Sequence, residues 1–589
     1  MQCGMEGLGR LVHIDMKGGP PRPSFLLQLL PLLKQWGASG LLVEWEDMFP
    51  WQGELALLAR QGHWTLQEVG ELLLAARGLE LQVVPLVQTF GHLEFVLKHG
   101  KFRHLREVAE YPNSLRPVAA DSSGEVAGLI REMLTQVVAA HETSLTLGPL
   151  RSVHIGCDEV WCLGQGQQTR AVLEAKCWSV TEAALDHMAT AARIARECRP
   201  GATVLVWDDM MREASVDQIR ARLLDTLVQP VVWSYGEQLS LGPGLLQRYT
   251  DLWGKGAVWG GSAWRGATGS NMAATTIRHH LNNQLAWLAA MQQGAQLAGI
   301  VLTGWARYDH YATLCELLPC GLPSLRCCLA ALQGGGWTLE THKACSSSMA
   351  LSSPLLLEPY CFLTGPDPEL PTFPGAAVYS LVLQYTRLQA HHQALTTSDA
   401  RQTWINEWQI EKGFLNPLQV KVTLLELIKL GEGLRDLASA LGRHLTDLCY
   451  DFTADEWVNT NISPKIREIE QLVFSVDLAL ARHEQKFVLI PLSKVPSVSS
   501  EEQEKGAGAR SRSTSRSRVV SVSSEEQEKG AEARSRSMSR SRLATTSSEE
   551  QEKVAEARSR SRIATASSEE QEKGLVARRS SCSTTSSDV

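Results

Sequence analysis

The sequence SVHIGCDEVW, residues 152–161, joins a strand-like run to two adjacent carboxylates. Its first residues are mostly apolar and β-branched, which is typical of a buried strand. Asp158 and Glu159 then follow as direct neighbours. Burying a charge is costly unless it is paired or used, and two like charges oppose each other's ionisation. Such a pair is tolerable at the open end of a strand, and we therefore predict a functional pocket there.

The same pattern recurs along the chain from Leu11 to Tyr311, where an apolar run ends in polar or aromatic residues and an amphipathic segment follows. Near-continuous apolar strands that alternate with helices indicate a parallel sheet covered on both faces. Helices are predicted at 24–37, 65–78 and 179–201, with Gly or Pro as stop signals. The runs predicted as strands are 11–18, 41–47, 81–89, 152–159, 203–210, 231–237, 257–264 and 299–308.

Eight such units predict an α/β fold, a (β/α)₈ TIM barrel over residues 1–340. A doubly wound open sheet is the alternative. No glycine-rich phosphate loop follows the first run, which weakens that alternative.

Two further regions follow the predicted barrel. Residues 345–490 show apolar residues at three-four spacing and predict an α-helical domain. Residues 491–589 contain repeats that begin with SSEE at 499, 523, 547 and 567. They have no apolar face, so we predict a disordered Ser/Arg/Glu repeat tail. The Arg-Ser runs superficially resemble the tails of RNA-processing proteins, and a repeat expansion without an essential task is the alternative.

Composition restricts the function classes. The chain has 589 residues and a net charge of -7, which argues against nucleic acid as a partner of the barrel. It contains neither a signal-peptide pattern nor an apolar stretch long enough to cross a membrane. The 13 cysteines lack metal-ligand or disulfide spacing. We therefore expect a cytoplasmic protein, with the nucleus as a second candidate location and a homodimer as a candidate assembly.

Carboxylates and indoles gather at the predicted strand ends, and this combination describes a carbohydrate cleft better than a phosphate, nucleotide or metal site. Zinc-protease, Walker and α/β-hydrolase motifs are missing, and we expect neither a metal nor a cofactor. The strand-end residues are Asp15, Lys17, Glu44, Glu46, Gln88, Asp158, Glu159, Trp207, Asp208, Trp233, Tyr235, Trp264 and Trp305, and His92 and Glu94 lie in a nearby loop.

The segment HIGCDE, residues 154–159, resembles the His-x-Gly-x-Asp-Glu signature of glycoside hydrolase family 20, the β-N-acetylhexosaminidases. The resemblance covers about residues 8–340. It implies an exo-acting hydrolase that releases terminal N-acetylgalactosamine and N-acetylglucosamine from β-linked N-acetylhexosaminides. It also implies a retaining mechanism in which the substrate supplies its own nucleophile.

The resemblance implies a role for each site residue. Glu159 would protonate the glycosidic oxygen and later activate water, and Asp158 would hold the 2-acetamido N–H. Tyr235 would hydrogen-bond the acetamido oxygen. The indoles around the acetamido methyl and the sugar face would be Trp207, Trp264 and Trp305, and the hydroxyl or supporting partners would be Asp15, His92 and Glu94.

Two positions depart from the family pattern. The chain has Lys17 where relatives usually place an arginine that clamps the 3- and 4-hydroxyls, and Arg307 where they often place a carboxylate. Without the paired N–H donors of that arginine, the site distinguishes less well between the two orientations of the 4-hydroxyl. We therefore hypothesise that both galacto and gluco N-acetylhexosaminides are accepted.

Two other functions are considered. One is a catalytically silent sugar-binding barrel or scaffold that acts through its Arg-Ser tail, against which the intact Asp158, Glu159 and Tyr235 argue. The other is a protein-linked O-GlcNAc hydrolase, a family that typically uses paired aspartates rather than the Asp-Glu pair.

Overall fold

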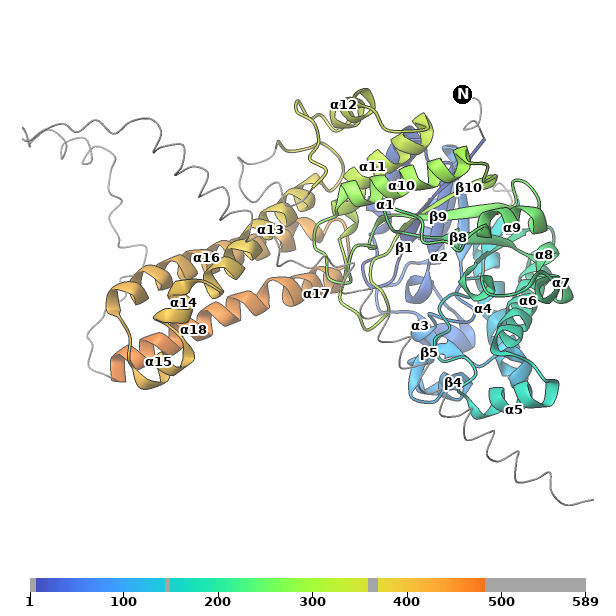
Figure 1. Ribbon diagram of the computed structural model, residues 1–589, viewed down its shortest axis with the longest axis horizontal. Helices are drawn as coiled ribbons and strands as arrows, with labels where there is room; N and C mark the ends of the chain where they lie inside the picture. The colour runs from blue at the N-terminus through green and yellow to red at the C-terminus, as the bar shows by residue number, and fades with distance from the viewer. Residues whose placement is uncertain (1–6, 143–148, 359–368, 483–589) are drawn as a thin grey trace, which may run out of the picture. The chain divides into compact units, whose positions relative to one another are not determined.

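Eight parallel strands form a closed barrel in the computed structural model, which describes residues 7–142, 149–358 and 369–482 (Figure 1). Around the barrel the strand order is β1, β10, β9, β8, β7, β6, β3, β2, and β2 closes on β1. The strands are β1 (Gly9–Asp15), β2 (Gly40–Glu44), β3 (Gln82–Leu86), β6 (Ser152–His154), β7 (Thr203–Trp207), β8 (Gln229–Trp233), β9 (Val258–Arg265) and β10 (Leu297–Gly304).

Each predicted run overlaps one barrel strand, so the predicted (β/α)₈ barrel is confirmed. The helix between β2 and β3 begins at a capping box of Thr65 and Glu68, which satisfies free N–H groups of its first turn. The main helices between and after the strands are α1 (Pro23–Gln35), α2 (Leu66–Gly78), α4 (Glu125–Glu142), α6 (Val180–Cys198), α7 (Val216–Ala221), α8 (Leu224–Leu227), α9 (Leu245–Trp253), α10 (Ile277–Gln292) and α11 (Leu318–Gly334).

The barrel strands separate two hydrophobic layers, because successive side chains on a strand point to opposite faces. On β7, Leu205 and Trp207 belong to the inner cluster, whereas Val204 and Val206 belong to the outer core. The inner cluster is small and ends in indoles near the carboxyl ends of the strands. Chemistry in such barrels takes place at that end, which we call the mouth.

The longest departure from strand-helix alternation lies between β3 and α4. It contains the antiparallel strands β4 (Arg106–Val108) and β5 (Tyr111–Leu115) and the short helix α3 (Glu94–Leu97). Another insertion, helix α5 (Gln167–Lys176), follows β6. Glu107 of β4 joins the two insertions, because its carboxylate accepts the Gly164 and Gly166 N–H groups.

Helices continue after the barrel, and α13, α16 and α18 run alongside one another (Figure 1). None of the helices in the described ranges is long and apolar enough to cross a membrane. These elements are α12 (Leu339–Ser348), α13 (Ala376–Thr396), α14 (Asp399–Thr403), α15 (Glu407–Lys412), α16 (Pro417–Leu445), α17 (Asp451–Asn461) and α18 (Ser463–Arg482).

The chain divides into two units, Met1–Ser493 and Lys494–Val589, and all described residues belong to the first. The barrel and the helices α12–α18 both belong to the first unit. The domain boundary near residue 340 stays a prediction, and the predicted disordered tail lies outside the described residues.

Candidate active site

The segment after β6 turns sharply at the mouth of the barrel. Gly156, Cys157 and Glu159 have φ angles of 66°, 75° and 49°. This left-handed backbone is costly for residues with side chains and persists only where the surroundings impose it. Gly91 supplies part of that constraint, since a Cβ atom there would lie 1.9 Å from the Asp158 carbonyl oxygen. The loop after β3 therefore fits closely against the backbone that carries both carboxylates.

Asp158 and Glu159 converge on one imidazole. His92 Nε2 lies 3.1 Å from Glu159 Oε2 and 3.6 Å from Asp158 Oδ2. The side chain of Asp158 is only 9% exposed, whereas that of Glu159 is 31% exposed. The two neighbours in the sequence therefore reach a common site at different depths.

The charges at this site are unevenly distributed. Burial raises the pKa of Asp158 to about 6, although the charge of His92 opposes the shift. Burial favours a neutral His92, but the charge of Asp158 and the hydrogen bond to Glu159 outweigh it and raise the pKa of His92 to about 10. At neutral pH the site therefore holds an ionised Asp158 beside a positively charged His92.

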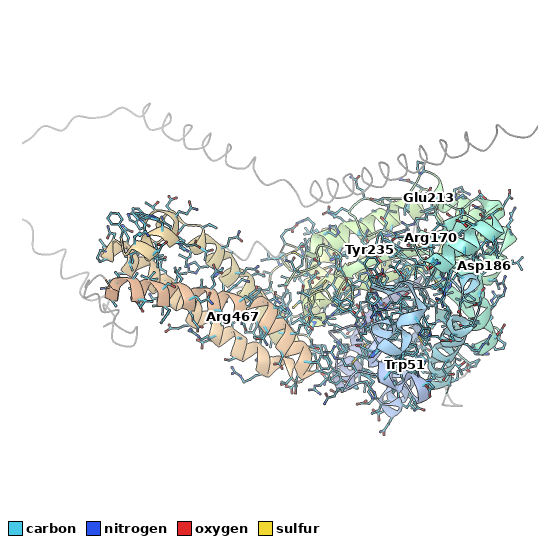
Figure 2. The ribbon with its side chains drawn as sticks, turned by 90° about the horizontal axis from the view of Figure 1, so that it is seen from below. Trp51, Arg170, Asp186, Glu213, Tyr235 and Arg467 are labelled. Carbon is cyan, nitrogen blue, oxygen red and sulfur yellow. The ribbon has the colours of Figure 1, made fainter. Side chains whose placement is uncertain are left out.

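Tyr235 follows β8 and lies in the barrel part of the molecule (Figure 2). Its phenol lies near the side chains of Thr303 and Trp305. Its ring stacks on Trp233, with ring centroids 5.2 Å apart. Burial raises the pKa of Tyr235 above its ordinary value, so the phenol keeps its proton and can donate a hydrogen bond.

Trp207 and Trp305 adjoin each other, with ring centroids 6.2 Å apart. Trp207 is 1% exposed and packs on His154, so it forms a floor beneath the mouth. Trp305 packs on His13 at a centroid distance of 4.7 Å and is only partly buried. Of these two indoles, Trp305 therefore has the ring surface that a ligand can contact.

The predicted position of Trp264 beside the sugar needs correction. Its ring belongs to the outer core, and a Cβ atom on Gly321 of α11 would lie 2.5 Å from it. Trp259, five residues earlier on β9, packs with the inner cluster. Residues five apart on a strand face opposite sides, and Trp264 therefore points away from the barrel interior.

Asp15 and Lys17 belong to a buried cluster of charges. Asp15 Oδ1 accepts the Lys17 N–H and Oδ2 accepts the Ala306 N–H, both at 2.8 Å. Lys17 Nζ lies 3.7 Å from Asp15, 3.9 Å from Glu44 and 3.4 Å from Glu46. Both oxygens of Asp15 thus serve the fold, and three carboxylates surround the Lys17 ammonium.

Glu94 and Arg307 also occupy buried positions. Glu94 is 5% exposed, and its Oε2 has no hydrogen-bond partner among the described residues. Arg307 Nη2 lies 2.6 Å from Glu456 Oε2 on α17. In the described ranges, no group of His, Cys, Asp and Glu is suited to hold a metal ion.

Two residues near the mouth were not predicted as site residues. His310 hydrogen-bonds Glu46, and Asp209 Oδ2 accepts the Glu159 N–H at 2.9 Å. His310 lies five residues after Trp305 and Asp209 two after Trp207. The available signal was their position, since Asp209 lies at the end of the predicted run 203–210 and His310 lies two residues after the run 299–308.

Comparison with known proteins identifies the family. No protein-family model matches the chain. Human hexosaminidase D is 38% identical over 469 residues, which cover 79% of this chain and 93% of the relative. Bovine hexosaminidase D is 43% identical over 347 residues, 58% of this chain and 97% of the relative. A solved β-N-acetylhexosaminidase from Bacteroides fragilis aligns with a TM-score of 0.43 at 13% identity, covering 58% of this chain and 70% of that one. From its similarity to the human relative over most of both lengths, the chain belongs to the hexosaminidase D family of glycoside hydrolases.

Proposed function

We propose that the chain is an exo-β-N-acetylhexosaminidase that removes terminal N-acetylgalactosamine and N-acetylglucosamine with retention of configuration. The observation that carries the proposal is the convergence of Asp158 and Glu159 on His92 at the mouth of the barrel. Membership of the hexosaminidase D family supports the same substrate class. Location in the cytoplasm or nucleus and assembly as a homodimer stay predictions.

In the first step, Glu159 donates a proton to the glycosidic oxygen as its bond to the anomeric carbon breaks. Glu159 is the more exposed of the two carboxylates, which suits contact with a departing aglycone. Its Oε2 lies 3.1 Å from His92 Nε2, and this hydrogen bond orients the carboxyl group. After the aglycone leaves, the Glu159 carboxylate accepts a proton from the incoming water.

The acetamido group of the substrate supplies the nucleophile in this mechanism. Its carbonyl oxygen attacks the anomeric carbon and forms an oxazolinium ion. Asp158 accepts the acetamido N–H and stabilises the positive charge, which requires the ionised carboxylate. Tyr235 donates a hydrogen bond from its phenol to the acetamido oxygen and fixes the direction of attack. Water then attacks the anomeric carbon, opens the oxazolinium ring and yields the sugar with its original anomeric configuration.

Both sugar epimers are expected to be substrates. The Lys17 ammonium is surrounded by three carboxylates, and Arg307 is paired with Glu456. Lys17 has no guanidinium, and the guanidinium of Arg307 is already paired. Neither side chain therefore offers two parallel N–H donors that would select one orientation of the 4-hydroxyl.

The test is hydrolysis of matched chromogenic GalNAc and GlcNAc β-glycosides by the purified full chain. Glu159→Gln should abolish turnover of substrates with poor leaving groups, and Asp158→Asn should lower kcat by about two to three orders of magnitude. If neither glycoside is hydrolysed, the proposed activity is refuted. Cleavage of a single epimer would refute only the dual specificity.

A further inference from the structure

One carboxylate outside the predicted site joins two loops of the mouth. Asp209 lies two residues beyond the end of β7. Its Oδ2 accepts the backbone N–H of Glu159 at 2.9 Å, and its Oδ1 lies 3.3 Å from the indole Nε1 of Trp233, which donates to it. Asp209 therefore connects the loop after β6 with the end of β8, on either side of β7.

Each end of this bridge holds a residue of the proposed mechanism. Glu159 has a φ of 49°, a conformation that a residue with a side chain keeps only under constraint. Trp233 stacks on Tyr235 with an interplanar angle of 24°. The two hydrogen bonds of Asp209 thus fix the backbone of the acid and the ring that supports the acetamido-binding phenol.

The bridge exists despite an electrostatic cost. Burial and the neighbouring charge of Asp158 raise the pKa of Asp209 to about 7. The Arg212 guanidinium forks onto Asp208, at 2.7 and 2.8 Å, rather than onto Asp209. The side chain of Asp209 is therefore held by two neutral N–H donors. It occupies this buried position although its charge and that of Asp158 repel each other.

We propose that Asp209 is a positioning residue that sets the spacing between Glu159 and Tyr235. This inference rests on the proposed function, because it assigns Asp209 a role through the acid and the phenol. Its carboxylate does not touch the reacting atoms. It keeps the proton donor and the acetamido clamp at the separation that one N-acetylhexosaminide requires.

The experiment replaces Asp209 with Asn in the full chain. Asn keeps the size of the side chain but presents an N–H group where one acceptor is needed. We expect kcat to fall about 10- to 100-fold with a methylumbelliferyl aglycone, a less activated leaving group than dinitrophenyl, because a displacement of about 1 Å carries such a cost. KM should stay within about threefold. The loss should be smaller with a dinitrophenyl aglycone, which departs without full protonation.

Glu213 offers a matched control. It is exposed, lies four residues after Asp209 and is seen at the surface in Figure 2. Glu213→Gln removes one acidic group from the same region and should leave kcat unchanged with both aglycones. If the loss of kcat depends on the leaving group in Asp209→Asn but not in Glu213→Gln, the cause is the position of the acid. A general change of charge or stability would affect both aglycones equally.

Trp233→Phe provides a second test, since it deletes the Nε1–H donor and keeps a ring to stack on Tyr235. The double variant with Asp209→Asn should be no slower than Asp209→Asn alone, because both changes break one bridge. A folded Asp209→Asn that retains wild-type kcat with both aglycones overturns the inference. If Asp209→Asn does not fold, unchanged kcat in Trp233→Phe overturns it and a reduced kcat supports it. A wild-type chain without hydrolysis would instead overturn the proposed function.

Discussion

His92 places a positive charge between the two carboxylates. It contacts Asp158 and Glu159, and its pKa of about 10 keeps it positively charged through the neutral range. Asp158, whose pKa is about 6, is ionised above that value. The acetamido N–H requires the ionised form, so kcat/KM should fall as the pH decreases through about 6.

Replacing His92 should move this acidic limb in a defined direction. The positive charge of His92 lowers the pKa of Asp158, so His92→Gln should raise that pKa and shift the limb to higher pH. The measurement is kcat/KM against pH for the wild type and the variant. His104→Gln is the control, because His104 is exposed and pairs with Glu125. An unshifted limb in His92→Gln would contradict the charge assignment.

Gly91 is a steric determinant of the site. An added Cβ would lie 1.9 Å from the Asp158 carbonyl oxygen and 3.2 Å from that of Glu159. Both contacts are backbone atoms, so the loops must separate. We expect Gly91→Ala to cost about 1–3 kcal/mol of stability and to reduce kcat strongly. Thermal unfolding and hydrolysis rates test this.

Gly100→Ala is the matched control for that substitution. A Cβ atom at Gly100 meets nothing within 4 Å, so stability and activity should stay close to wild type. If Gly91→Ala behaves like Gly100→Ala, the loop after β3 does not constrain the carboxylates.

At the level of elements, the strands were predictable and the side-chain directions less so. Eight buried parallel strands produce continuous apolar runs that a sequence displays directly. The Asp158–Glu159 pair is contiguous, so its place at one strand end could be predicted. Successive side chains on a strand point to opposite faces, so Trp259 and Trp264, five residues apart, cannot both face the barrel interior. Trp259 packs with the inner cluster and Trp264 with the outer core.

Partners far apart in the sequence could not be predicted. Glu456 pairs with Arg307 across 149 positions, and no periodicity connects them. The bridge from Asp209 to Trp233 depends on a turn after β7 that has no sequence signature of its own. Such contacts arise from tertiary packing rather than from local preference.

Helix α17 and the residues before it support two loops of the mouth. Thr453 Oγ1 donates to the Gly18 carbonyl oxygen, and Arg22 Nε donates to the Thr446 carbonyl oxygen. Glu456 pairs with Arg307, whose side chain is 8% exposed. These contacts hold the loop after β1, which carries Lys17, and the loop after β10, which follows Trp305.

Glu456→Gln should therefore destabilise the chain, because it leaves a buried guanidinium without its counter-charge. We expect a loss on the order of 1–3 kcal/mol, with the partial exposure of Glu456 reducing the effect. Asp455→Asn, an exposed neighbouring acid, is the control. Urea unfolding measures the difference, and equal stability of the two variants would show that the Arg307 pair contributes nothing.

For the whole molecule, activity should belong to the first unit, Met1–Ser493. Every residue of the proposed mechanism lies within Met1–Ser493. A chain that ends at Ser493 should retain the kcat, KM and unfolding temperature of the full chain. Parallel assays of both chains with the GalNAc and GlcNAc glycosides measure this. Loss of hydrolysis in the shorter chain would assign the repeats a part in catalysis.

The contacts of residues 446–453 with the loop after β1 also bear on synthesis. They join groups that are 424 and 435 positions apart in the chain. A ribosome releases the first strand long before the last helices emerge, so this loop remains without its support during most of translation. Such distant pairing is slow to form. We expect a nascent chain stalled before residue 446 to lack the finished entrance, so that hydrolytic competence is among the last properties acquired.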